Sequence, residues 1–331
     1  IAAFFLINHD RPNWSLGKKF DWWGMLFMAV FLGSLEYVLE EGASKDWFND
    51  DMITLFAVSA GLSSIAFFTR VLTAEVPIVD LRAFTNRNFA LGSLFSAVMG
   101  VGLFGLTYLF PLYLARVRGF TPLLIGETMF VTGVFMLLTA PIANRIVSML
   151  DPRMLLLLGF TGFALSTWQM TYITKDWDFW ELLAPQALRG CSLMFCMIPI
   201  SNLALGTMSL DRLKNAAGLY NLMRNLGGAL GLALINTLLN QRTDQHFERL
   251  RSQVTWSNAA ATEALTTLAD RFRAAGVDAD ALALRRLTEM VRREALVMSF
   301  ADVFLVLTGL IGGMMLLLVL MDRPAPAARR T

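Results

Sequence analysis

Apolar residues along the chain gather in long runs that short polar segments separate. After an apolar stub at 1–7, the runs lie at 22–40, 52–69, 88–112, 122–143, 154–173, 181–207, 216–239 and 297–321. A helix needs about 20 apolar residues to cross the ~30 Å hydrocarbon core of a bilayer. The runs lack the alternation of apolar and polar residues that is typical of membrane barrels. The pattern therefore predicts an all-α membrane protein with about eight transmembrane helices.

The first residues of the chain already lie inside an apolar stretch, which begins at Ile1 and continues to Ile7. A secretory signal peptide would carry a charged segment before its apolar core and a small-residue cleavage site after it. We therefore expect residues 1–7 to be the end of a transmembrane helix that begins upstream, and the chain to be a fragment.

Composition supports the membrane assignment and narrows the chemistry. Hydrophobic residues make up 56% of the 331 residues and charged residues 16%, whereas soluble domains have about 45–50% and 25%. A net charge of +2 gives no basic field for nucleic acid. Cys191 and Cys196 diverge on a helix and cannot form a disulfide. The G-x-G-x-x-G at Gly100, Gly102 and Gly105 lies inside an apolar run, so it is not a dinucleotide loop. We expect no enzyme, no cofactor and no metal.

The distribution of Lys and Arg predicts the orientation in the membrane. With the loop 8–20 in the cytoplasm, thirteen basic residues lie inside and four lie on the short outer loops. The segment 241–296 is then outside. Residues 263–275 have helical spacing with Gly276 as a stop, and Asp278 or Asp280 can cap a second helix. We interpret this segment as a solvated connector of two helices, with a docking surface for a partner as the alternative.

Ionisable residues at membrane depth give the strongest functional signal, because exposure to lipid costs roughly 2.5–3.5 kcal/mol for each. Arg224 and Arg189 lie at similar depth inside their runs. The Arg224 side chain could face a cavity, or it could form a structural ion pair or snorkel to the inner surface. Glu127 is a candidate proton or cation site, since burial disfavours the charged form of a carboxylate; an ordinary interfacial carboxylate is the alternative. The candidate pathway residues are Glu127, Arg224, Asn221, Arg189, Glu36 and Asp302.

Small residues at a spacing of four occur in two of the runs. Gly227 and Gly231 form a G-x-x-x-G pattern in the run 216–239, and Gly309 and Gly313 form another in 297–321. This spacing lets two helices approach backbone to backbone. Both pairs are therefore expected to mark helix packing.

Four segments resemble one transporter family. The segments FDWWGMLFMAVFLGSLEYVLEEGASKDWF, IVDLRAFTNRNFALGS, APIANRIVSMLDPRMLLLLG and AAGLYNLMRNLGGALGLALIN, the last including Arg224, are similar to parts of the fourteen-helix drug:proton antiporters of the EmrB/QacA type. The resemblance implies a major facilitator fold, with two six-helix bundles and two extra helices between them.

The resemblance also implies how the chain is divided. Residues 1–20 would hold the end of a preceding helix and a cytoplasmic loop, and 21–87 the two extra helices and a cytoplasmic connector. Residues 88–321 would be the C-terminal six-helix bundle, with 241–296 as its long periplasmic or extracellular loop, and 322–331 a cytoplasmic tail. The N-terminal bundle would be almost entirely absent.

By this resemblance, the full-length protein would be a proton-coupled multidrug exporter in the bacterial inner membrane. Its partners would be small-molecule substrates, protons and the lipid bilayer, together with a periplasmic membrane-fusion adaptor and an outer-membrane channel, and no nucleic acid. Two alternatives remain: a transporter of an anionic metabolite, with Arg224 and Arg189 as an anion clamp, and a membrane scaffold that acts through the segment 241–296.

Overall fold

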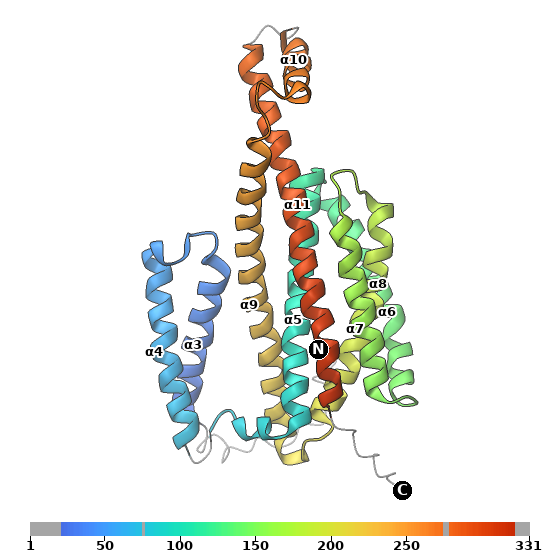
Figure 1. Ribbon diagram of the computed structural model, residues 1–331. Helices are drawn as coiled ribbons and strands as arrows, with labels where there is room; N and C mark the ends of the chain where they lie inside the picture. Colours follow the sequence, from blue (N-terminus) through green and yellow to red (C-terminus); the bar gives the residue numbers. More distant parts are fainter. Residues whose placement is uncertain (1–20, 75–76, 274–277, 322–331) are drawn as a thin grey trace. The chain divides into compact units, whose positions relative to one another are not determined.

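The computed structural model describes residues 21–74, 77–273 and 278–321, and these residues form helices joined by short turns. Eight helices in these ranges are long and apolar enough to cross a membrane. They are α3 (Trp22–Glu41), α4 (Asp51–Thr73), α5 (Arg87–Tyr113), α6 (Pro122–Val147), α7 (Pro152–Gln169), α8 (Phe179–Leu205), α9 (Leu210–Arg251) and α11 (Ala279–Leu317), with α10 (Ala259–Arg273) between the last two (Figure 1). The prediction of an all-α protein with eight spans is confirmed. The stub 1–7, Gly276 and the tail 322–331 lie outside the described residues.

The chain divides into two compact units, Ile1–Arg82 and Ala83–Thr331. The described part of the first unit is a hairpin of α3 and α4. Asp50 caps α4 by accepting hydrogen bonds from the amides of Met52 and Ile53 at 2.9 and 3.0 Å. At the other end of the hairpin, Arg70 Nε lies 3.0 Å from Asp21 Oδ1 and joins the two helices.

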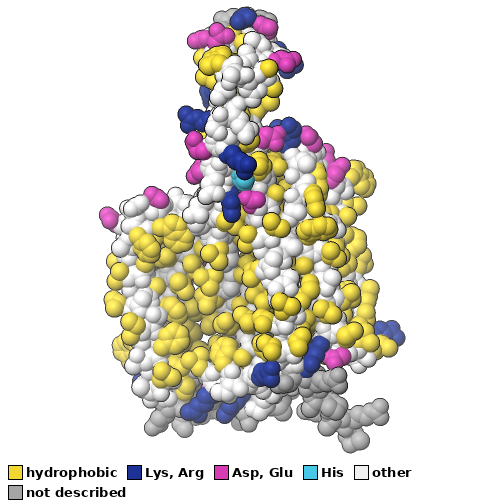
Figure 2. Space-filling view, viewed as in Figure 1, with side chains coloured by type: hydrophobic (Ala, Val, Ile, Leu, Met, Phe, Trp, Pro, Cys, Tyr) yellow, Lys and Arg dark blue, Asp and Glu magenta, His cyan; other side chains and the backbone are white. Residues whose placement is uncertain are grey.

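In the second unit, α5 is the central helix. It packs against α8, α9 and α11, while α8 also packs against α6 and α7. Phenylalanine rings fill the contacts: Phe95 of α5 lies 5.5 Å from Phe160 of α7, and Phe110 of α5 lies 5.8 Å from Phe304 of α11, measured between ring centroids. Such ring pairs contribute beyond the area they bury. Apolar side chains form the middle band of the bundle, and charged side chains gather toward its ends (Figure 2).

Glycines allow α5 and α9 to touch along their backbones. A Cβ added at Gly227 would collide with the backbone carbonyl of Ala97, and one added at Gly231 would lie 2.9 Å from Val101 Cα. The second pair behaves differently. A Cβ added at Gly309 or Gly313 meets no atom of the described residues within 4 Å. The structure therefore brings only the first G-x-x-x-G pair into a packed helix interface.

The expected connector at 241–296 requires a correction. Its ends are not separate solvated helices but direct continuations of two membrane helices, because α9 runs on to Arg251 and α11 begins at Ala279. Residues 239–251 and 279–297 contain no glycine or proline, so nothing in the sequence stops either helix where the apolar run ends. The predicted helix at 263–275 is α10, and Asp278 caps α11 through the amide of Ala281. We call residues 240–273 and 278–296 the projection, and the end of the bundle from which they extend the projecting end (Figure 1).

Candidate functional site

Arg189 is the most deeply buried cation of the bundle. It lies on α8 with 1% of its surface exposed, and its guanidinium points at α5. Its Nη2 donates to Thr107 Oγ1 at 3.0 Å and to the carbonyl oxygen of Leu103 at 3.5 Å, and its Cζ lies 5.3 Å from the centre of the Phe110 ring. Arg189 Nε and Nη1 are buried without a hydrogen-bond partner in the described part of the chain.

No acidic side chain in the described ranges forms a salt bridge with Arg189. A buried charge without a counter-charge is costly, so it is rarely kept for stability alone. The hydroxyl of Thr107 also donates to the carbonyl of Leu103 at 2.6 Å, and Thr107 itself is exposed on α5. Thr107 therefore connects the buried guanidinium with the surface of the bundle.

Polar side chains also line the contact between α6 and α8, one turn from Arg189. Gln186 is fully buried, and its side-chain oxygen accepts a short hydrogen bond from Thr132. Further along the same contact, Thr139 Oγ1 lies 3.2 Å from Cys191 Sγ. Cys191 and Cys196 are both free, as the sequence predicts.

Arg224 lies on α9, against a different level of α5. Its Nε donates to Ser96 Oγ at 3.4 Å, and its Cζ lies 5.1 Å from the centre of the Tyr220 ring. Asn221 is exposed on the neighbouring turn. Ser96 and Thr107 are eleven residues apart on α5, which corresponds to ~16 Å along the helix axis. Arg189 and Arg224 therefore contact α5 at separate levels, and together they cannot clamp one small anion.

The three candidate carboxylates have two kinds of surroundings. Glu127 on α6 and Glu36 on α3 are exposed, and neither forms a hydrogen bond or ion pair with another described residue. Asp302 on α11 is paired: its Oδ2 lies 2.8 Å from His246 Nε2 and 3.6 Å from Arg242 Nε. His246 cannot be recognised as a site residue from the sequence, because its carboxylate partner is 56 residues away in the chain and on another helix.

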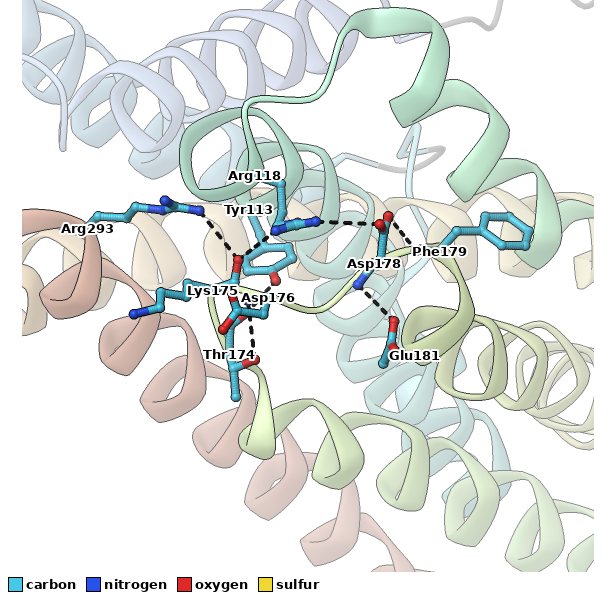
Figure 3. Close-up of polar contacts among 9 residues, drawn as sticks. All are labelled: Tyr113, Arg118, Thr174, Lys175, Asp176, Asp178, Phe179, Glu181 and Arg293. Atoms are coloured by element: carbon cyan, nitrogen blue, oxygen red, sulfur yellow. Dashed lines mark hydrogen bonds and ion pairs between the residues drawn. The ribbon is translucent and has the colours of Figure 1, made fainter. Parts of the chain in front are cut away.

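A polar cluster ties three helices together at the projecting end (Figure 3). After Pro111, α5 continues into a π-helical turn, Leu114–Arg118, which ends at Gly119 with φ of 69°. This turn directs Arg118 at the segment between α7 and α8. Arg118 Nη1 donates to the carbonyl of Lys175 at 2.9 Å and its Nη2 lies 3.5 Å from Asp178 Oδ2.

Three more contacts fix the same segment. Tyr113 of α5 donates its hydroxyl to the carbonyl of Thr174 at 2.6 Å, and Arg293 of α11 donates to the carbonyl of Lys175 at 3.4 Å. Lys175 Nζ lies 2.7 Å from Glu294 Oε1. The hydrogen bond and the negative charge of Glu294 raise the pKa of Lys175 above its ordinary 10.5, so the lysine remains charged at physiological pH. The cluster therefore joins α5, α8 and α11 at this end of the bundle.

The described residues thus form helices long and apolar enough to cross a membrane, with the guanidinium groups of Arg189 and Arg224 inside the packed bundle. The sequence matches the Major Facilitator Superfamily over residues 2–232. The chain belongs to this superfamily. It is a multi-pass membrane protein of a transporter family and not an enzyme.

The named relatives are exporters or resistance proteins. The chain is 36% identical over 316 residues to the colistin resistance protein EmrB of Acinetobacter baumannii, covering 96% of this chain and 62% of the relative. It is 28% identical over 238 residues to the multidrug export protein EmrB of Escherichia coli K12, covering 72% and 46%. It is 26% identical over 273 residues to the fatty acid resistance protein FarB of Neisseria gonorrhoeae, covering 82% and 54%. The chain thus spans about half to three fifths of these relatives and is related to EmrB-type exporters.

Proposed function

We propose that the full-length protein is a proton-driven exporter of lipophilic or cationic compounds that works by alternating access. The names of the relatives, multidrug export, colistin resistance and fatty acid resistance, support export of toxic compounds. In this mechanism the bundle 88–321 rocks against a second bundle, while its own helices stay packed. The close backbone contacts between α5 and α9 would help the bundle to move as one rigid body.

The observation that carries the proposal is the buried guanidinium of Arg189. Ionisable side chains inside transmembrane bundles commonly mark substrate or ion pathways. Arg189 has no acidic partner in the described residues, and it reaches the bundle surface through Thr107. One charge that crosses 100 mV supplies about 2.3 kcal/mol, and a pH gradient adds to this, so proton entry can drive export.

A dye-transport assay tests the proposal. Everted membrane vesicles that contain the full-length protein should accumulate a lipophilic cationic dye when respiration acidifies their interior, and vesicles without the protein should not. Addition of nigericin and valinomycin, which together dissipate the pH gradient and the potential, should abolish accumulation. Accumulation that continues unchanged after both are added would contradict proton coupling.

We propose that the projection binds a periplasmic adaptor protein. The adaptor would connect the transporter to an outer-membrane channel. A groove of about 390 Å³ between α9 and α11 is lined by apolar side chains that include Phe247, Val254 and Leu287. Trp256, between α9 and α10, is 85% exposed. Exposed apolar surface outside the membrane is typical of protein interfaces.

An anionic metabolite is the second candidate substrate, because neither Arg189 nor Arg224 forms a salt bridge with a described residue. The ~16 Å between their contact levels on α5 would make the two arginines separate anion subsites. Two such subsites would bind an elongated substrate with two acidic groups better than a small anion.

A further inference from the structure

A pocket of about 540 Å³ lies at the projecting end of the bundle, between α9, α11 and the π-helical turn that ends α5. Its volume is in the range of small-molecule sites. Leu239 and Leu296 supply its apolar part, and Leu239 is 2% exposed. We call it the end pocket. It contains neither Arg189 nor Arg224, and therefore it is separate from the candidate pathway.

The charged residues of the end pocket are of both signs. Arg116, Arg292 and Arg293 supply three guanidinium groups, and Asp244 and Glu289 supply two carboxylates. The two carboxylates would repel a ligand that is only an anion, and the three guanidinium groups would repel one that is only a cation. A ligand that carries a negative and a positive group can satisfy both sets.

Most of these charged side chains form no ion pair with another described residue. Arg116, Arg292 and Asp244 form no hydrogen bond or ion pair through their side chains with the described residues. Arg293 donates to the Lys175 carbonyl through Nη2, but its Nε is buried without a partner in the same part of the chain. Among these five side chains, Glu289 alone forms ion pairs within the described residues, with Arg285 at 3.4 Å and Arg286 at 3.1 Å.

The position of the pocket along the helices indicates where its ligand comes from. Leu239 is the last residue of the apolar run of α9, and Leu296 directly precedes that of α11. Each helix turns from apolar to charged at this level, which is where the hydrocarbon core of a bilayer meets the headgroup layer. Lipid headgroups are the most concentrated zwitterions at this depth.

We propose that the end pocket binds the headgroup of a zwitterionic phospholipid, phosphatidylethanolamine, with its phosphate on Arg116, Arg292 and Arg293 and its ammonium on Asp244. Guanidinium groups bind phosphate oxygens with two parallel N–H donors. The carboxylate of Asp244 accepts the N–H donors of the ammonium. The bound lipid would join α9 and α11 to the end of α5, beside the cluster of Figure 3. This proposal is independent of what the protein transports.

Native mass spectrometry of the purified full-length protein tests it, with phosphatidylethanolamine, phosphatidylcholine and phosphatidylglycerol titrated separately. Arg292→Ala should weaken binding of phosphatidylethanolamine and phosphatidylglycerol about tenfold, because it removes a charge-assisted phosphate contact. Asp244→Asn should weaken phosphatidylethanolamine alone and abolish its advantage over phosphatidylcholine, whose methylated ammonium has no N–H donor. The matched controls Arg249→Ala on α9 and Glu263→Gln on α10 lie outside the pocket and should bind like the wild type.

Three results would overturn the proposal. If Arg292→Ala binds phosphatidylethanolamine as tightly as Arg249→Ala does, the pocket holds no headgroup. If Asp244→Asn weakens phosphatidylethanolamine and phosphatidylglycerol equally, the ammonium is not recognised. If glycerophosphoethanolamine, which lacks acyl chains, binds as tightly as the lipid, the ligand is a soluble zwitterion and not a membrane lipid. Dye transport is not needed for any of these results, so they are distinct from failure of the proposed function.

Discussion

Replacement of Gly227 with alanine is expected to destabilise the bundle by about 1–3 kcal/mol, the usual cost of overpacking a tight contact. The added Cβ would collide with the carbonyl oxygen of Ala97, which is backbone and cannot rotate away. The helices α5 and α9 would have to separate, and α5 is the centre of the bundle. Thermal unfolding of the detergent-solubilised protein should occur several degrees lower than in the wild type.

Gly309→Ala is the matched control for this prediction. It makes the same chemical change in an identical G-x-x-x-G pattern, but its Cβ meets no atom of the described residues within 4 Å. Because alanine also favours the helix by up to about 1 kcal/mol over glycine, this variant should be neutral or slightly more stable. Equal destabilisation by the two variants would show that the α5–α9 contact is not as close as the structure has it.

Arg189→Met is expected to lower transport at least tenfold without lowering the stability of the bundle. Methionine fills much of the space of the arginine, and removal of a buried charge without a partner relieves a desolvation cost. The measurements are dye accumulation in everted vesicles and thermal unfolding of the purified protein. Arg249→Met, the same change at an exposed position of α9, should leave both unchanged.

The outcome of Arg189→Met separates a functional role from a structural one. A variant that unfolds at much lower temperature would show that the guanidinium stabilises the bundle through Thr107 and Phe110. A stable variant with full transport would remove Arg189 from the pathway. Selective loss of transport for acidic compounds, with cationic dyes unaffected, would favour the anionic candidate substrate.

The helices could be predicted from the sequence because a membrane imposes a simple length requirement on each apolar run. The end of α9 and the beginning of α11 could not be predicted in this way, because one apolar run ends at 239 and the next begins at 297, while both helices extend through charged residues between these positions. Glycine and proline commonly end helices, and neither occurs where the two apolar runs stop, so the change from apolar to charged residues does not by itself end a helix. The two predicted helices of the segment 241–296 are present, but the second of them is the beginning of α11 and not a separate helix.

Contacts between side chains on different helices could not be predicted, because they depend on how the helices pack and not on the sequence near each residue. The two G-x-x-x-G pairs look alike as sequence, but only Gly227 and Gly231 lie against a neighbouring helix. The position of Arg189 within its apolar run can be read from the sequence, whereas its contact with Thr107 depends on how α8 packs against α5. His246 was missed for the same reason, since Asp302 reaches it only after α9 and α11 pack together.

The central claim is that the polar groups around Arg189 open through Thr107 onto a water-filled pathway. Reaction of Thr107→Cys with a membrane-impermeant maleimide tests it most directly, in a background with Cys191→Ser and Cys196→Ala. We predict that Thr107→Cys is labelled rapidly and that a transported dye slows this labelling. The control Leu137→Cys lies on α6 at a position that is 75% exposed and has apolar neighbours, and it should not be labelled. If Thr107→Cys reacts as slowly as Leu137→Cys, position 107 faces lipid or protein and the account is contradicted.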